Sequence, residues 1–152
     1  MSFAWMVDTP IGVLTLVERN GSLTEARFGK CIKQEAVQET PLLLRAAREL
    51  DEYFKGRRKA FTVPLAPEGT PFQQKCWQAL CEIPYGETRT YQQQAQAVEN
   101  PKACRAVGMA NHRNPLPIFI PCHRVVGKSG RLTGYAGGLS MKEALLTLEK
   151  EK

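Results

Sequence analysis

The sequence predicts an α+β fold made of two lobes. Three observations support this prediction: apolar runs of strand length occupy the first part of the chain, apolar residues at helical spacing occupy the second, and a Pro-Glu-Gly break at residues 67–69 separates them. We expect an N-terminal α/β lobe over residues 1–69 and a C-terminal, mainly helical lobe over residues 70–152. A chain of 152 residues is long enough for one domain or for two small lobes that share a core.

The N-terminal lobe is predicted to contain a small sheet and one helix. Its strands are expected over residues 3–7, 12–17 and 23–28. The dipeptide Asn20-Gly21 favours a hairpin between the last two of them. Residues 42–54 carry apolar side chains at helical spacing and are predicted to form the helix. Residues 61–65 could return to the sheet as a last strand.

The C-terminal lobe is predicted to begin with three helices. Thr70 is a suitable N-cap and Pro71 favours the first helical position, so the first helix is expected to start there. Its apolar face is formed by Phe72, Cys76, Trp77, Leu80 and Cys81. The next two helices are expected over residues 91–98, capped by Thr90, and from Lys102 to about Asn111. Two short helices around a tight break form a helix-turn-helix pattern, whose second helix typically meets DNA near its N-terminal end.

The rest of the lobe is predicted to hold a hairpin and a closing helix. Val125-Val126 and Arg131-Leu132 are expected to pair across a turn at residues 127–130, and a glycine-rich turn follows at residues 134–138. The closing helix is expected over residues 140–149, with Ser140 as its N-cap and Glu143 as the capping-box partner.

The positive charge of the chain is concentrated in its last third. Residues 1–70 hold ten Lys/Arg and nine Asp/Glu, residues 71–101 hold two and three, and residues 102–152 hold nine and three, which gives +1, −1 and +6. A localised basic surface is typical of nucleic-acid binders, although charge alone fits a solvated basic face equally well. No apolar run approaches the roughly 20 residues of a membrane span, and residues 1–10, which carry Asp8 and no basic residue, are not expected to form a signal peptide. We therefore expect a soluble cytoplasmic protein without membrane contact.

Cys122 is the cysteine with the neighbours that chemistry would need. The five cysteines are irregularly spaced, which favours reduced thiols, and two histidines offer a metal few ligands. Cys122 precedes His123 and Arg124, and a neighbouring cation or imidazole lowers the pKa of a thiol. His123 could take the proton directly or through a water, and Glu149 is a candidate for orienting the imidazole. A buried structural thiol beside a core histidine is the commoner case for an isolated pair, and it stays open at this point.

Several motifs accompany this pair in a fixed order. The segment Ile120-Pro121-Cys122-His123-Arg124-Val125 is preceded by Arg105-Ala106-Val107-Gly108 and Asn114-Pro115, and it is followed by Gly134-Tyr135-Ala136-Gly137-Gly138, Lys142, Leu145-Leu146 and Glu149. Over residues 100–149 the chain therefore resembles the O6-alkylguanine-DNA alkyltransferases, also called methylated-DNA–protein-cysteine methyltransferases. The resemblance continues more loosely back to Thr70, and the N-terminal lobe matches in outline.

The resemblance implies a fold and an activity. The N-terminal lobe would have a ribonuclease-H-like topology, and the C-terminal lobe would contain a winged helix-turn-helix. The protein would bind double-stranded DNA that contains O6-alkylguanine, and it would move the alkyl group irreversibly and stoichiometrically to Cys122. No metal or organic cofactor is needed for such a transfer, and we expect a monomer.

The resemblance also implies roles for individual residues. Cys122 would be the alkyl acceptor, activated by His123 and Glu149 through a bound water, and Asn114 would hold the turn that carries it. Tyr91 would polarise the departing guanine. Arg105 would fill the gap that the flipped base leaves in the duplex. The pocket would be lined or buttressed by Tyr135, Gly137 and Lys142. Further DNA contacts are expected from Lys102, Ala106, Gly108, Arg113 and Arg124.

Three alternatives remain open at the level of sequence. The protein could bind alkylated DNA without reacting. It could be a hydrolase that uses Cys122 and His123, although the sequence offers no oxyanion motif. The N-terminal lobe could have an activity of its own, but its acidic residues Asp8, Asp51 and Glu52 are scattered over strand and helix.

Overall fold

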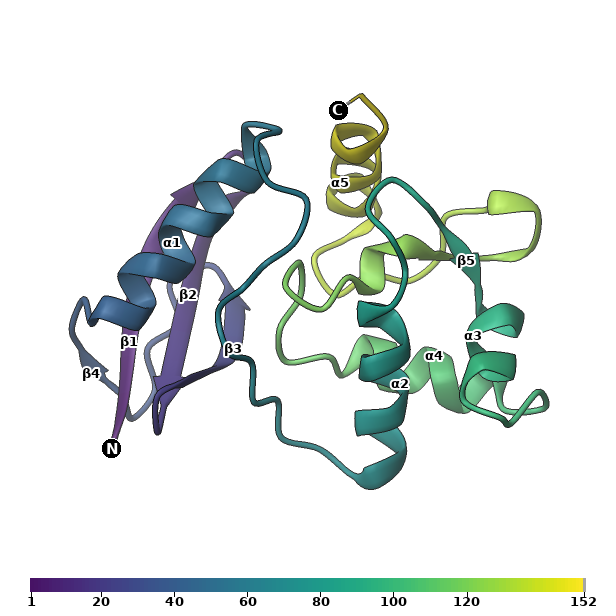
Figure 1. Cartoon of the computed structure of the whole chain (residues 1–152), viewed down its shortest axis with the longest axis horizontal. Coiled ribbons are helices and arrows are strands. Elements are labelled where there is room, and N and C mark those ends of the chain that lie inside the picture. The colour runs from purple at the N-terminus through teal and green to yellow at the C-terminus, as the bar shows by residue number, and fades with distance from the viewer. Residues whose placement is uncertain (152) are drawn as a thin grey trace. The chain divides into compact units, whose positions relative to one another are not determined.

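The structure, a computed structural model, describes residues 1–151 of the chain (Figure 1). It divides into two compact units, Met1–Glu68 and the residues from Gly69 on. Among the residues described, no helix has both the length and the apolar character that crossing a bilayer requires.

The first unit is a four-stranded sheet covered by one helix. Its strands are β1 (Ser2–Thr9), β2 (Gly12–Arg19), β3 (Ser22–Phe28) and β4 (Ala36–Val37), in the spatial order β3-β2-β1-β4. β1, β2 and β3 pair antiparallel, whereas β4 joins β1 in parallel. Helix α1 (Pro41–Phe54) lies against the sheet (Figure 1) and buries Leu43, Ala46 and Leu50. The three predicted strands and the helix are confirmed to within two residues at each end, while the short β4 was not predicted.

The strand expected over residues 61–65 is wrong. Only a single parallel bridge forms there, between Leu65 and Leu23. Pro64 has no N–H to give to a ladder, and the N–H groups of Thr62 and Val63 donate to the carboxylate of Glu49 at 2.8 and 3.3 Å. The backbone N–H groups of this segment therefore bond to a buried side chain of α1 and not to a neighbouring strand.

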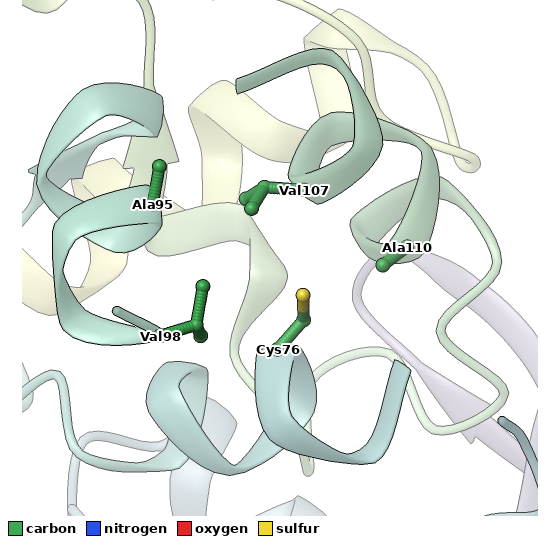
Figure 2. Packing of buried hydrophobic residues seen from close by; sticks show 5 residues of the cluster. All are labelled: Cys76, Ala95, Val98, Val107 and Ala110. Atoms are coloured by element: carbon green, nitrogen blue, oxygen red, sulfur yellow. The ribbon is translucent and has the colours of Figure 1, made fainter. Parts of the chain in front are cut away.

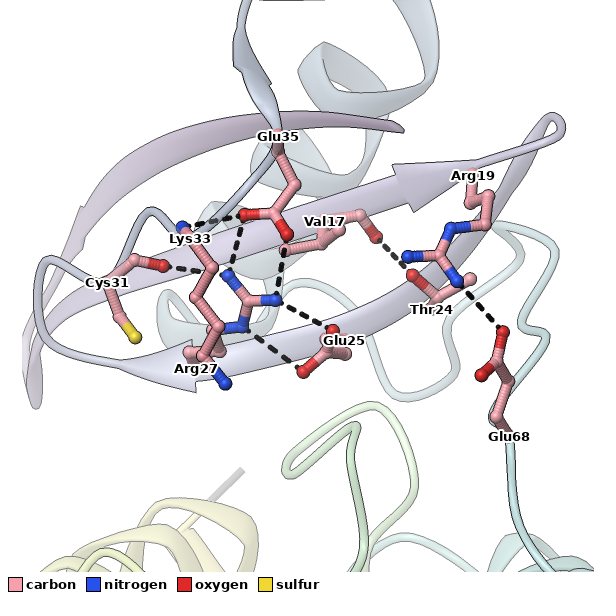
Figure 3. A network of polar contacts seen from close by, with 9 residues as sticks. All are labelled: Val17, Arg19, Thr24, Glu25, Arg27, Cys31, Lys33, Glu35 and Glu68. Carbon is pink, nitrogen blue, oxygen red and sulfur yellow. Dashed lines mark hydrogen bonds and ion pairs between the residues drawn. The ribbon is translucent and has the colours of Figure 1, made fainter. Parts of the chain in front are cut away.

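A charged cluster fixes the loop between β3 and β4 (Figure 3). Arg27 donates to Glu25 through Nε and Nη2 at 3.1 and 2.8 Å, and to Glu35 through Nη1 and Nη2 at 2.8 and 3.1 Å. Its Nη1 also donates to the carbonyl of Cys31 at 2.9 Å. The Arg27 guanidinium holds the pKa of Glu35 at about 2. Cys31 thus belongs to a loop that is held by charge-assisted hydrogen bonds.

The second unit opens with α2 (Pro71–Cys81), β5 (Arg89–Thr90), α3 (Tyr91–Ala97) and α4 (Cys104–His112). Capping boxes start both α2 and α3, at Thr70 and Thr90. The three helices enclose a small core of Cys76, Ala95, Val98, Val107 and Ala110 (Figure 2). The helix-turn-helix angle is further fixed by a buried reciprocal amide pair between Gln94 and Asn111, with hydrogen bonds of 2.9 and 2.7 Å.

The segment that follows α4 contains the short 3-10 helices η1 (Cys122–Arg124) and η2 (Lys128–Gly130), the strand β6 (Val125–Val126) and the closing helix α5 (Leu139–Glu151). The hairpin predicted over residues 125–132 is wrong, because β6 pairs in parallel with β5 and residues 131–132 form no strand. Ser129 and Gly130 both have positive φ angles, which wind the chain into a tight turn closed by a 2.6 Å bond from Gly127 N–H to the carbonyl of Arg131.

Three finer predictions in this unit also need correction. Cys81 is exposed and does not belong to the apolar face of α2. Helix α4 begins at Cys104 because Ala103 N–H closes a turn onto Asn100, so Lys102 precedes the helix. Helix α5 begins at Leu139, which places Ser140 inside its first turn and not at the N-cap.

Candidate active site around Cys122

The segment that carries Cys122 is held by Asn114. The Asn114 side chain accepts from Leu116 N–H at 2.9 Å and donates from Nδ2 to the carbonyl of Ile120 at 2.8 Å. The N–H of Cys122 also donates to the Ile120 carbonyl, at 2.8 Å. Pro121 lies between the two residues, and its φ and ψ of −80° and 65° are those of an inverse γ-turn. The side-chain amide of Asn114 therefore fixes the backbone of the segment that carries the Cys122 thiol.

Backbone strain accompanies this turn. Ile118 is buried and has a φ of 77°, a left-handed conformation that a β-branched residue rarely adopts. Such a conformation costs about 1–3 kcal/mol and persists only where the surrounding structure imposes it. Here the two bonds of Asn114 and the bond from Ile120 N–H to the carbonyl of Leu116, at 2.8 Å, impose it.

His123, Glu149 and Arg124 form a buried charged network behind Cys122. His123 Nε2 lies 2.6 Å from Glu149 Oε2, and neither side chain is more than 1% exposed. Arg124 donates to both oxygens of Glu149, from Nε at 2.8 Å and from Nη2 at 3.0 Å. The remaining guanidinium nitrogen of Arg124 donates to the carbonyl of Ile83 at 2.7 Å, and Gly86 N–H bonds to Glu149 at 3.3 Å.

This network fixes the tautomer of His123. A Glu149 carboxylate that accepts from Arg124 is ionised, so it also accepts the proton on His123 Nε2. His123 Nδ1 then carries a lone pair, and this buried atom has no hydrogen-bond partner among the described residues. Burial lowers the pKa of His123, while the bond to Glu149 opposes that shift. His123 is therefore neutral and presents a basic nitrogen.

Two polar groups oppose the effect of burial on Cys122. Burial raises the pKa of the Cys122 thiol, whereas hydrogen bonding with the Asn114 side chain and the positive charge of Lys142 lower it. The Lys142 side chain is fully buried, and its Nζ donates to the carbonyl of Thr133 at 2.7 Å. Burial lowers the pKa of Lys142, and the neighbouring Cys122 raises it. A thiolate at Cys122 would therefore lie in the field of a buried ammonium group.

A cavity of about 40 Å³ opens beside Cys122. The residues that line it are Gly108, Asn111, His112, Cys122, Gly134, Tyr135 and Ala136. A water needs roughly 10–15 Å³ on this measure, so the cavity has room for a small alkyl group. Burial and the neighbouring Cys122 raise the pKa of Tyr135, which stays neutral at one wall.

The structure places the other predicted site residues at varying distances from this cavity. Tyr91 does not line it but lies one contact away, since a Cβ atom on Gly108 would be 3.7 Å from its ring. Gly137 follows the cavity wall in the turn before α5. The exposed side chains of α4 and its flanks include Lys102, Arg105, Ala106 and Arg113. These four residues are open to solvent, as a contact with DNA would require.

Arg124 needs a correction. It was predicted to contact DNA, but it is only 6% exposed and its guanidinium is bonded to Glu149 and to Ile83. Its Cζ also lies 5.7 Å from the centroid of the Tyr85 ring. The guanidinium is buried because its donors are bonded to acceptors inside this unit, the carboxylate of Glu149 on α5 and the carbonyl of Ile83.

Sequence reasoning gave no role to Asn111 or Thr133. Asn111 lines the cavity, and its position three residues after Gly108 on the same helix was a signal that could have found it. Thr133 contacts both Tyr91 and Lys142, and no spacing rule predicts a contact from an irregular loop. Among residues 1–151, no three His, Cys, Asp or Glu side chains are arranged to hold a metal ion.

Comparison with known proteins accounts for both units. The DNA binding domain of 6-O-methylguanine DNA methyltransferase matches residues 71–151, and its ribonuclease-like domain matches residues 4–67. The methylated-DNA–protein-cysteine methyltransferase of Methanosarcina barkeri is 48% identical over 150 residues, which cover 95% of each chain. The constitutive enzyme of that name from Bacillus subtilis is 47% identical over 159 residues, with 99% of this chain and 96% of the relative covered.

Solved structures agree with the sequence relatives. The crystal structure of Mycobacterium tuberculosis OGT in complex with DNA matches with a TM-score of 0.92 and 45% identity, over 98% of this chain and 93% of that one. The crystal structure of M. tuberculosis O6-methylguanine methyltransferase matches with a TM-score of 0.91 and 43% identity, over 99% of this chain and 94% of that one. The predicted fold class and the family resemblance are thereby confirmed: the chain belongs to the 6-O-methylguanine DNA methyltransferase family.

Proposed function

We propose that this protein repairs DNA by direct reversal, taking the alkyl group from O6 of guanine onto Cys122 once and irreversibly. The observation that carries the proposal is the buried His123–Glu149–Arg124 network behind a thiol that borders a small cavity. Residues 70–152 would bind the duplex and carry out the transfer, with residues 1–69 as a separate lobe. The reaction would take place in the cytoplasm and would need one protein molecule for each lesion.

The transfer starts with the thiol proton. His123 Nδ1 takes that proton, directly or through one water, and Glu149 stabilises the imidazolium that forms. The Cys122 thiolate then attacks the saturated carbon in line with the C–O6 bond. A sulfur–carbon bond forms, the carbon–oxygen bond breaks, and its electron pair stays on guanine. Guanine regains one proton as the thiol loses one, so the products are an S-alkyl cysteine and an unmodified guanine.

The departing guanine needs stabilisation of its developing negative charge. Tyr91 would supply it by donating its hydroxyl hydrogen to the base. Lys142 would act on the attacking side instead, because its buried ammonium group lowers the pKa of the Cys122 thiol. Asn114 would keep the attacking sulfur in place through its bonds to the turn.

DNA would bind on the exposed side of α4. Lys102, Arg105 and Arg113 offer positive charge, while Ala106 and Gly108 let the helix approach a groove closely. The target base must leave the stack to reach Cys122, and Arg105 would occupy the gap. The target base would enter the cavity beside Cys122, whose wall includes Tyr135.

The test is an intact-mass measurement after incubation with a short duplex that contains one O6-methylguanine. We expect one added methyl group, mapped to Cys122 by peptide analysis, and no further turnover when DNA is in excess. The Cys122→Ala variant should bind the same duplex without gaining mass. An unmodified wild-type protein that still binds the duplex would support lesion recognition without reaction, and repeated turnover would support a hydrolase.

A further inference from the structure

Thr133 is engaged on three sides, although it lies in an irregular loop. Its Oγ1 donates to Tyr91 Oη at 3.2 Å. Its carbonyl accepts from Lys142 Nζ at 2.7 Å. Its methyl group faces Gly127, where an added Cβ atom would lie only 3.3 Å from Thr133 Cγ2. A β-branched side chain has few χ1 choices, so these contacts fix the direction in which the hydroxyl points.

Tyr91 depends on this contact for the orientation of its polar end. Its ring packs against the core between the helices and over Gly108, which places the body of the side chain. The Tyr91 hydroxyl, in contrast, has one side-chain hydrogen-bond partner among the described residues, and that partner is Thr133. Gly134, the next residue after Thr133, lines the cavity beside Cys122. Thr133 thus joins the tyrosine hydroxyl to the wall of that cavity.

We propose that Thr133 is a positioning residue for alkyl transfer, and that it acts by donating its hydroxyl hydrogen to Tyr91. This inference rests on the proposed function. A phenol has one hydrogen and two lone pairs, so Tyr91 Oη that accepts from Thr133 keeps its own hydrogen for the departing guanine. A donor bound to the phenol oxygen also polarises its O–H bond, which strengthens the bond that Tyr91 donates.

Lys142 completes the arrangement by holding the Thr133 backbone. A buried ammonium group needs acceptors, and the Thr133 carbonyl supplies one at 2.7 Å. The same lysine lies in the field of Cys122. Thr133 therefore bonds both to Lys142, which lies in the field of the attacking Cys122, and to Tyr91, which would stabilise the departing guanine.

The experiment compares three variants in single-turnover methyl transfer from a duplex that contains O6-methylguanine, at saturating protein. Thr133→Val removes the hydroxyl but keeps the shape that faces Gly127, and Thr133→Ser keeps the hydroxyl. We expect the valine to slow transfer about three- to tenfold, the range for loss of one neutral hydrogen bond, with little change in duplex affinity. Serine should restore most of the rate. Thr133→Ala should behave as the valine does, which covers the case in which valine fails to fold.

The decisive comparison repeats the Thr133→Val change in a protein that already carries Tyr91→Phe. If Thr133 acts through the tyrosine hydroxyl, then Thr133→Val should add almost nothing to the loss already caused by Tyr91→Phe. Equal losses in both backgrounds would show that Thr133 merely packs the loop, and would overturn the proposal. A valine variant as fast as the wild type, or faster, would also overturn the proposal, because transfer would then not depend on the Thr133 hydroxyl. Failure of the wild type to gain a methyl group would refute the proposed function and not this inference alone.

Discussion

Replacing Arg124 by methionine would test the network behind Cys122 most directly. The change removes two hydrogen bonds to Glu149 and one to the carbonyl of Ile83, all inside the protein. Removing one partner of a buried ion pair costs about 3–5 kcal/mol, because the other charge stays buried without its counter-charge. For a protein of this size each kcal/mol shifts the melting temperature by about 2–4 °C. We therefore expect Arg124→Met to melt about 6–20 °C below the wild type.

The assay is thermal unfolding followed by circular dichroism, with Arg124→Lys as the matched control. Lysine keeps the positive charge but cannot reproduce the two parallel donors of a guanidinium, so it should recover part of the loss. Alkyl transfer should also slow in Arg124→Met at temperatures where the protein is folded, because His123 loses an oriented carboxylate. A methionine variant that melts within 2 °C or so of the wild type would refute the argument that Arg124 holds Glu149 ionised.

Three further predictions concern other parts of the molecule. Asn114→Ala should destabilise the protein by about 2–4 kcal/mol in denaturant unfolding, because two buried hydrogen bonds around Ile120 are lost, and transfer to Cys122 should slow. Arg105→Ala should slow transfer from duplex DNA more than transfer from free benzylguanine; equal losses would contradict a role in the duplex. Glu35, with a pKa lowered from about 4.5 to about 2, stabilises the folded state above pH 4.5 and loses that contribution as the pH falls towards 2. Between pH 4.5 and pH 2 the free energy of unfolding of the wild type should therefore fall by about 2 kcal/mol more than that of Glu35→Gln. An equal fall in both proteins would contradict a stabilising role for the Glu35 carboxylate.

The parts of the fold that could be predicted from sequence are those with a local signal. Apolar runs of strand length located β1, β2 and β3, and the Thr70-Pro71 pair located the start of α2. The strand expected at residues 61–65 failed because its donors bond to Glu49, a residue in a different element. The hairpin at residues 125–132 failed for a related reason, since β6 found its partner in β5, more than thirty residues earlier.

The candidate site shows the same division between local and distant signals. Adjacency in the chain pointed to Cys122 and His123, Glu149 was a candidate from the predicted closing helix, and the family resemblance implied a role for all three. The structure shows His123 and Glu149 in contact. The burial of Arg124 could not be predicted, because an arginine after a histidine looks like one more member of a basic surface. Its partner lies 25 positions later on another helix, and only the fold brings the two together.

The parallel pairing of β5 with β6 has a consequence for the dynamics of the protein. Arg89 and Thr90 precede the helix-turn-helix, while Val125 and Val126 follow η1, the 3-10 helix that begins at Cys122. Opening the two-stranded ladder would expose the amide groups next to Cys122 and release the N-cap of α3 in the same event. Amide hydrogen exchange in these two stretches should then proceed with one common opening free energy. The nucleophile and the helices that face DNA would belong to a single cooperative unit, so neither could loosen while the other stayed ordered.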